Sequence, residues 1–231
     1  MSIVGVIQAR MGSSRLPGKV MMPLAGRPLI WHIADRIRRA GIERIVLATT
    51  VDPRNDPMVA YWTTLNQPVV RAIGEDDIAG RLRMAVDAAL ADAILKVNAD
   101  CPLVDPGVMR LLVDRFLAED GLDYVSNKIK FTWPLGLSAE VISRRALALC
   151  DATMTEAVDR ELVCNYIRDH PDRFRRASVC GERDLSHLDF SVDTPADYDA
   201  MSRLFRAIYH EGECFSLDAA LAFLARNDLP P

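Results

Sequence analysis

The stretch VIQARMGSSRLPGKVMMPLAGRPLIWHI, residues 6–33, decides how the remainder of this chain is interpreted. The apolar run over Ile3–Gln8 is rich in β-branched residues and predicts a buried strand. A loop containing glycine, serine and proline follows, and Pro28 then opens a helical pattern that Gly41 ends. A strand, a polar loop and a helix in this order are typical of the first unit of a parallel α/β sheet.

The charge of this opening differs from that of the chain as a whole. The first 34 residues carry four cations and no carboxylate, and the first acid is Asp35. The whole chain has 28 Lys+Arg, 32 Asp+Glu and a formal net charge of −4. The segment therefore predicts a bound anion, whereas the overall negative charge argues against a nucleic-acid partner, which would require a basic face.

Composition predicts an ordinary soluble protein. Of the 231 residues, 50% are hydrophobic and 26% are charged, and a single domain over 1–231 is the simplest organisation. The five cysteines form no CxxC pair, which favours reduced thiols and a cytoplasmic location. No apolar stretch approaches the roughly 18 residues of a membrane span, so we expect no membrane partner.

The pattern beyond the opening alternates strands with helices. Strands are expected over 44–50, 69–71 and 93–97, and helices over 28–40, 56–65, 77–90 and 106–118. This order implies a mostly parallel sheet, in which ligands bind outside the carboxyl ends of the strands. After Leu122 the pattern loosens and predicts a small antiparallel extension around 127–143. A helix over 156–169, a strand over 188–192, and helices over 195–209 and 216–225 are expected to follow.

The loop over 9–19 has the composition of a phosphate cradle. Its candidate ligands are the backbone and side chains of Ala9, Arg10, Gly12, Ser13, Ser14, Arg15, Gly18 and Lys19. Glycine permits close backbone approach, serine offers donors, and arginine grips phosphate oxygens bidentately. The loop contains neither GxxxxGK[ST] nor GxGxxG. The alternative is a solvated loop with three ordinary cations, and the pattern does not say which phosphate is bound.

Two carboxylates are candidates for a metal beside this loop. Asp100 follows the strand expected over 93–97, and Asp193 follows the strand expected over 188–192. Mg²⁺ that accompanies a triphosphate is commonly held by one or two carboxylates. Asp193 or Thr194 could instead cap the helix that begins near Pro195, and Asp105 is best explained as the N-cap of the helix over 106–118.

The motifs resemble a known family. IQARMGSSRLPGKVMMPLAGRPLIWHI closely resembles the opening of the cytidylyltransferases grouped with spore-coat polysaccharide biosynthesis protein F. These are similar in turn to the 3-deoxy-manno-octulosonate and acylneuraminate cytidylyltransferases. NADCPLVDP, YVSN, PLGLSAEV, DRELVCNYI and LSHLDFSVDTPADY follow in the family's order, so the resemblance covers residues 2–205.

The resemblance implies a fold, a reaction and residue roles. The fold would be a Rossmann-like α/β/α sandwich of the glycosyltransferase-A nucleotidyltransferase type. The enzyme would use Mg²⁺ to transfer CMP from CTP to an acidic sugar of the 2-keto-3-deoxy type, releasing diphosphate, for surface polysaccharide synthesis. A homodimer is implied as well. Carried over by position, triphosphate ligands would be Arg10, Ser13, Arg15 and Lys19. The metal ligands would be Asp100 and Asp193, and Arg10, Lys19 and Asp100 would act in catalysis.

The acceptor half departs from the family pattern. The chain reads GLS, ending at Ser138, where relatives commonly read GLD, and RELV, starting at Arg160, where they often read REHV. The candidate acceptor contacts are Ser138, Glu140, Arg160 and His187. A phosphonate or another non-sugar acid remains open as acceptor, as does a silent nucleotide-binding protein. A glycosyltransferase that consumes a sugar nucleotide would need a DxD motif, and the DYD ending at Asp199 falls in an expected helix.

Overall fold

The computed structural model of the protein describes residues 1–226 and is built around a mixed sheet of seven strands, in the order β5-β4-β1-β6-β8-β7-β9. Within the described residues these strands are β1 (Ile3–Gln8), β4 (Ile45–Thr50), β5 (Val69–Ala72), β6 (Ala93–Asn98), β7 (Tyr124–Ser126), β8 (Ala139–Ser143) and β9 (Arg176–Ser178). Only β8 runs antiparallel to its neighbours. A separate hairpin pairs β2 (Pro23–Leu24) with β3 (Arg27–Pro28).

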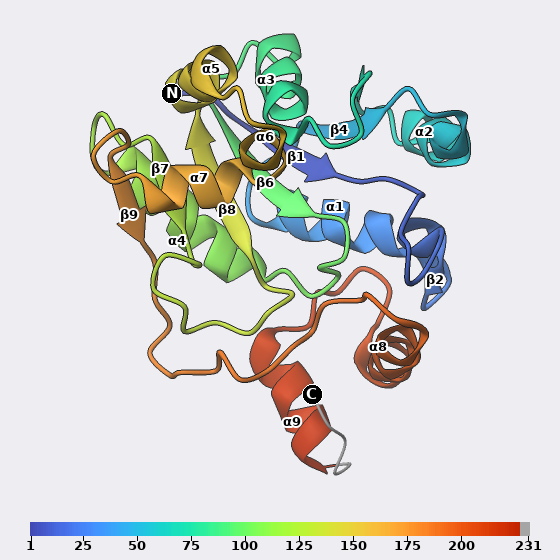
Figure 1. Ribbon diagram of the computed structural model, residues 1–231. Helices are drawn as coiled ribbons and strands as arrows, with labels where there is room; N and C mark the ends of the chain where they lie inside the picture. Colours follow the sequence, from blue (N-terminus) through green and yellow to red (C-terminus); the bar gives the residue numbers. More distant parts are fainter. Residues whose placement is uncertain (227–231) are drawn as a thin grey trace.

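Helices cover both faces of the sheet, so that α3 and α5 lie on one side and α1 and α4 on the other (Figure 1). The described α-helices are α1 (Leu29–Arg39), α2 (Asp56–Thr64), α3 (Ile78–Ala88), α4 (Pro106–Leu117), α5 (Arg144–Thr153), α6 (Ala157–Glu161), α7 (Val163–Asp169), α8 (Pro195–Ile208) and α9 (Leu217–Arg226). Short 3₁₀ turns are η1 (Lys19–Met21) and η2 (Pro53–Asn55). The predicted α/β/α sandwich is therefore confirmed.

The central strands β1, β4 and β6 are largely apolar and almost entirely buried, because each has helices on both of its faces. All six residues of β4 are buried, and in β1 alternate side chains enter opposite core layers, Ile7 on the α1 side and Val6 on the α3 side. In the parallel register Gln8 lies opposite both Ala48 and Asn98. The segments that leave β1, β4 and β6 consequently emerge side by side at one edge of the sheet.

The second half of the chain departs from several predictions. The antiparallel pair of β7 and β8 belongs to the main sheet, with β8 hydrogen-bonded to β6, and forms no separate extension. The helix expected over 156–169 is two helices, interrupted at Leu162 (φ −101°, ψ 37°). Neither α5 nor β9 was expected. Within residues 1–226, no helix is both long and apolar enough to cross a bilayer.

The strand predicted over 188–192 is wrong. This segment forms one isolated bridge, between Leu135 and Asp189, and no ladder. Asp189 Oδ1 instead accepts bonds from the backbone N–H and the hydroxyl of Ser191, at 2.8 and 2.7 Å. Phe190 and Val192 are buried, so the alternation that suggested a strand reflects burial without strand pairing. The prediction of a single domain over 1–231 stays a prediction, and residues 227–231 lie outside the described part of the chain.

Candidate functional site

A polar cavity of about 310 Å³ lies at the edge of the sheet where β1 and β6 end. Its walls come from the loop after β1, the segment between β5 and α3, the end of β6, the end of α6 and the residue before α8's N-cap. The charged lining residues are Arg10, Arg15, Lys19, Glu75, Asp76, Arg81, Asp100, Glu161 and Asp193. The position outside the carboxyl ends of parallel strands is the one expected for a ligand site.

The loop after β1 closes on itself before it reaches η1. The Gly18 N–H donates to Met11 O at 2.9 Å, and the Lys19 N–H donates to Leu16 O at 3.2 Å. Gly18 has φ +75°, a left-handed conformation that glycine adopts without steric cost. This closure places Ser13, Ser14 and Arg15 in the cavity wall, and their binding of an anion stays a prediction.

Lys19 connects this loop to both predicted metal ligands. Its side chain is only 10% exposed. The Nζ atom donates to Val192 O and to Asp193 Oδ1, both at 2.8 Å, and lies 3.5 Å from Asp100 Oδ2. Residues from the first, middle and last thirds of the chain thus meet at one ammonium group.

A backbone hydrogen bond of the preceding residue, Val192, positions Asp193. The Val192 N–H donates to Asp100 O at 2.9 Å, which fixes the two acidic segments side by side. Thr194 is the N-cap of α8, in a capping box with Asp197. The alternative that Asp193 caps this helix is therefore wrong. The Asp193 carboxylate instead lies 2.8 Å from Lys19 Nζ and 3.0 Å from Arg15 Nη2.

The donor set at this junction fits a hard divalent cation. Asp100 and Asp193 have side chains about 30% exposed, and both reach within 3.5 Å of the same Lys19 nitrogen. Carboxylate oxygens are the ligands that Mg²⁺ prefers. Among residues 1–226, no group of three or more His, Cys, Asp or Glu side chains could hold a metal ion. A cation bound by these two carboxylates would therefore need further oxygens from a ligand or from water.

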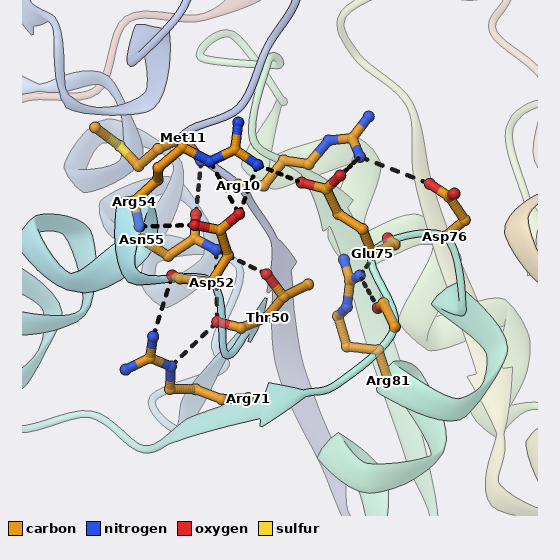
Figure 2. A network of polar contacts seen from close by, with 11 residues as sticks. Arg10, Met11, Thr50, Asp52, Arg54, Asn55, Arg71, Glu75, Asp76 and Arg81 are labelled. Carbon is orange, nitrogen blue, oxygen red and sulfur yellow. Dashed lines mark hydrogen bonds and ion pairs between the residues drawn. The ribbon is translucent and has the colours of Figure 1, made fainter.

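Two acidic residues between β5 and α3, which sequence reasoning missed, face Arg10 of the loop after β1 (Figure 2). Arg10 Nη1 lies 3.6 Å from Glu75 and 3.8 Å from Asp76. The guanidinium of Arg81 is buried and donates to the carbonyl oxygens of Gly74 and Glu75 at 3.0 and 2.5 Å. Burial lowers the pKa of Arg81.

The four predicted acceptor residues lie outside the described lining of this cavity. The Glu140 carboxylate is buried against Lys96 Nζ at 2.9 Å and the Tyr124 hydroxyl at 2.6 Å. Burial alone would raise its pKa, but Lys96 and Tyr124 outweigh burial and lower the pKa of Glu140 to about 2.

The other three candidates are placed as follows. Arg160 grips Asp77 in a fork, at 2.9 and 3.0 Å, and its Nη2 lies 2.8 Å from Asp151. Ser138 immediately precedes β8, and His187 lies in the irregular segment that leads towards Asp193. Contact of these side chains with an acceptor stays a prediction.

Comparison with known proteins agrees with the site. A sequence model of the family described as Cytidylyltransferase matches residues 4–219. The chain belongs to the cytidylyltransferase family. This cytidylyltransferase is 28% identical, over 88% of its length and 86% of the relative's, to spore coat polysaccharide biosynthesis protein SpsF of Bacillus subtilis. Both the predicted family and the nucleotidyltransferase class are thereby confirmed.

Solved structures show the same fold. A cytidylyltransferase from Leptospira borgpetersenii superposes with a TM-score of 0.92 at 25% identity, covering 99% of this chain and 95% of that one. CMP:2-keto-3-deoxy-manno-octonic acid synthetase, solved in complex with CTP, superposes with a TM-score of 0.67 at 19% identity, covering 90% and 99%. At that identity the second likeness concerns the fold alone.

Proposed function

We propose that this cytidylyltransferase uses Mg²⁺ to transfer CMP from CTP to an acidic sugar of the 2-keto-3-deoxy type, for surface polysaccharide synthesis. The observation that carries the proposal is the junction at Lys19, where the loop after β1 meets Asp100 and Asp193. The names of the related proteins support a sugar acid as acceptor and a role in surface polysaccharide synthesis.

The loop after β1 would hold the triphosphate. Arg10, Ser13, Arg15 and Lys19 supply charge and donors, and the backbone at Ala9 and Gly12 allows close approach. Arg10 and Arg15 are 43% and 63% exposed and are paired with carboxylates across the cavity. Each can exchange such a pairing for a phosphate oxygen at little cost, since exposed ion pairs contribute about 1 kcal/mol or less.

Asp100 and Asp193 would hold the metal, which supplies positive charge to the phosphate oxygens when it is bound. The chain's own residues would then contribute electrostatic stabilisation. A hydroxyl of the acceptor attacks the α-phosphorus in line and gives up its proton to water, the bond between the α-phosphorus and the bridging oxygen breaks, and diphosphate leaves. Lys19 and Arg10 would stabilise the charge that builds on the transferring and leaving groups. No covalent enzyme intermediate is required.

The acceptor would lie beyond the α-phosphate, towards Asn98 and Glu161, which line the far wall of the cavity. Ser138, Glu140, Arg160 and His187 stay candidate acceptor residues. The part of the segment 127–143 that precedes β8 is the proposed acceptor and dimer surface of a cytoplasmic homodimer, because β8 itself is buried between β6 and β7. The alternative glycosyltransferase function gains no support, because Asp197 and Asp199 lie within α8, where Asp197 completes the capping box.

The test is diphosphate release from each of the four ribonucleoside triphosphates, with Mg²⁺ and a panel of acidic sugars. We expect acceptor-dependent release with CTP alone, abolished by Asp100→Ala and by Asp193→Ala. Release with another nucleotide would overturn the choice of base. Release that survives both substitutions would overturn the assignment of the metal ligands.

A further inference from the structure

A buried amide outside the cavity fixes the backbone of the loop after β1. Asn55 closes η2 and is only 2% exposed. Its Oδ1 atom accepts from the Met11 N–H at 2.8 Å, across 44 residues of sequence, and its Nδ2 atom donates to Thr50 Oγ1 at 2.8 Å (Figure 2). Both ends of the amide are therefore used, one on the loop and one at the end of β4.

Met11 is the residue on which the loop closes. Its carbonyl oxygen accepts from Gly18 N–H, while its own N–H is held by Asn55. The peptide units on both sides of Met11 are thus fixed, with Arg10 directly before it. If the bond to Asn55 were lost, the buried Asn55 amide would be left without its loop partner, and the base of the loop could shift relative to β4.

The frame that holds Asn55 is itself rigid. Asp52 Oδ1 accepts from the Arg54 N–H at 2.8 Å, and the Asn55 N–H donates to Asp52 O at 2.9 Å. From the neighbouring strand, Arg71 donates to Thr50 O at 3.1 Å and to Asp52 O at 3.2 Å. The segment after β4 is therefore braced from β5, and the Asn55 side chain hydrogen-bonds it to the loop after β1.

We infer that Asn55 is a positioning residue for the anion-binding loop, acting through the Met11 peptide to set the direction of Arg10 and the loop donors. It touches neither the cavity nor a bound anion directly. The effect on binding rests on the proposed function, because it requires that the loop binds a triphosphate. The effect on Met11 does not, because it depends only on the hydrogen bond.

Gln67 offers a matched control. Its side-chain Oε1 accepts from the Ile45 N–H at 2.8 Å, so it makes the same kind of amide-to-backbone bond at the opposite end of β4. Gln67→Ala removes this bond while leaving the loop untouched. Asn55→Ala and Gln67→Ala should therefore free one backbone amide each, Met11 in the first variant and Ile45 in the second.

Two measurements on the full chain test the inference. By NMR, Asn55→Ala should speed hydrogen exchange of the Met11 amide about tenfold or more, and Gln67→Ala should leave it unchanged. By calorimetry, Asn55→Ala should weaken binding of inorganic triphosphate with Mg²⁺ about tenfold, and Gln67→Ala less than about twofold. If Asn55→Ala does not fold, Thr50→Val, which removes the partner of Nδ2, should weaken binding about threefold.

Equal triphosphate affinities for Asn55→Ala and Gln67→Ala would overturn the inference. If Asn55→Ala does not fold, an unchanged triphosphate affinity in Thr50→Val would overturn it. Inorganic triphosphate carries no base and needs no acceptor, so a wrong nucleotide or sugar leaves this comparison intact. If the native protein binds no triphosphate, the proposed function fails. Exchange at Met11 then decides alone whether Asn55 holds the loop.

Discussion

The ammonium of Lys19 lies 2.8 Å from the carboxylate of Asp193, although 174 residues separate them in the chain. Lys19 also donates to the carbonyl oxygen of Val192, whose N–H is bonded to Asp100 O. One lysine therefore joins an anion-binding loop to two carboxylates. Lys19 here pairs with the two carboxylates. With Mg²⁺ and a triphosphate bound, the carboxylates would hold the metal and Lys19 would contact the phosphate oxygens.

Replacement of Lys19 should remove activity more than stability. Lys19→Met keeps the length of the buried stem and removes the charge, so we expect kcat/KM for CTP to fall about 100-fold, the loss typical of one electrostatic donor at a transferring group. Steady-state kinetics measure this. Arg203→Met, at an exposed cation on α8, is the control and should match the native enzyme. A loss under threefold in Lys19→Met would contradict the assigned role.

Removal of the divalent cation should abolish activity without unfolding the protein. Arg15 and Lys19 already neutralise Asp193 in the absence of metal, so the fold does not depend on a cation there. We expect a chelator to stop diphosphate release, Mg²⁺ to restore it, and the melting temperature to change by less than about 2 °C. Full activity in excess chelator would count against the metal assignment.

Gly136 should tolerate no side chain. It has φ +81°, and a Cβ atom there would lie 2.4 Å from the backbone carbon of Phe190. Gly136→Ala should therefore reduce the free energy of unfolding by about 3 kcal/mol. Gly212 also has positive φ, +84°, but open space around it, so Gly212→Ala should cost only about 1 kcal/mol. Denaturant titration distinguishes the two, and equal losses would show that the close approach to Phe190 is unimportant.

His32 should make the protein less stable in mild acid. Burial lowers its pKa to about 4, and its Nε2 lies 2.7 Å from Leu24 O. Because the folded pKa lies below the unfolded value of about 6.5, the unfolded chain binds the proton first, so stability is complete above that value and falls as pH drops towards 4. Between about pH 8 and pH 5 the loss from this group should be about 2 kcal/mol. His32→Gln should remove that part of the pH dependence, and an unchanged dependence would refute it.

The sequence predicted the first half of the fold because its signals are local. Largely apolar runs marked β1, β4 and β6, and Asp100 was found because it lies two residues after the end of β6. The second half depends on contacts between distant segments. Val192 is held by Asp100 rather than by a strand partner, so the alternation of Phe190 and Val192 was mistaken for strand pairing.

The candidate site likewise contains residues with a local sequence signal and residues placed by contacts between distant segments. The cations of the loop after β1 were recognisable from spacing and charge, but Glu75 and Asp76 enter the cavity from a segment without a motif. Arg160 belongs to a recognisable motif, yet it turns to Asp77 and Asp151, a partnership set by the packing of α6 against α3. Asn55 lies in an ordinary-looking turn, and only the three-dimensional structure reveals its bond to Met11.

The most direct test of the account is calorimetric binding of CTP with and without Mg²⁺, in the native protein and in Asp193→Asn. The matched control is Asp189→Asn, which changes an aspartate bonded only to Ser191 among the described side chains. We predict Mg²⁺-dependent binding of CTP in the native protein and the control, and binding at least about tenfold weaker in Asp193→Asn. Binding of CTP that is indifferent both to Mg²⁺ and to Asp193→Asn would contradict the central claim.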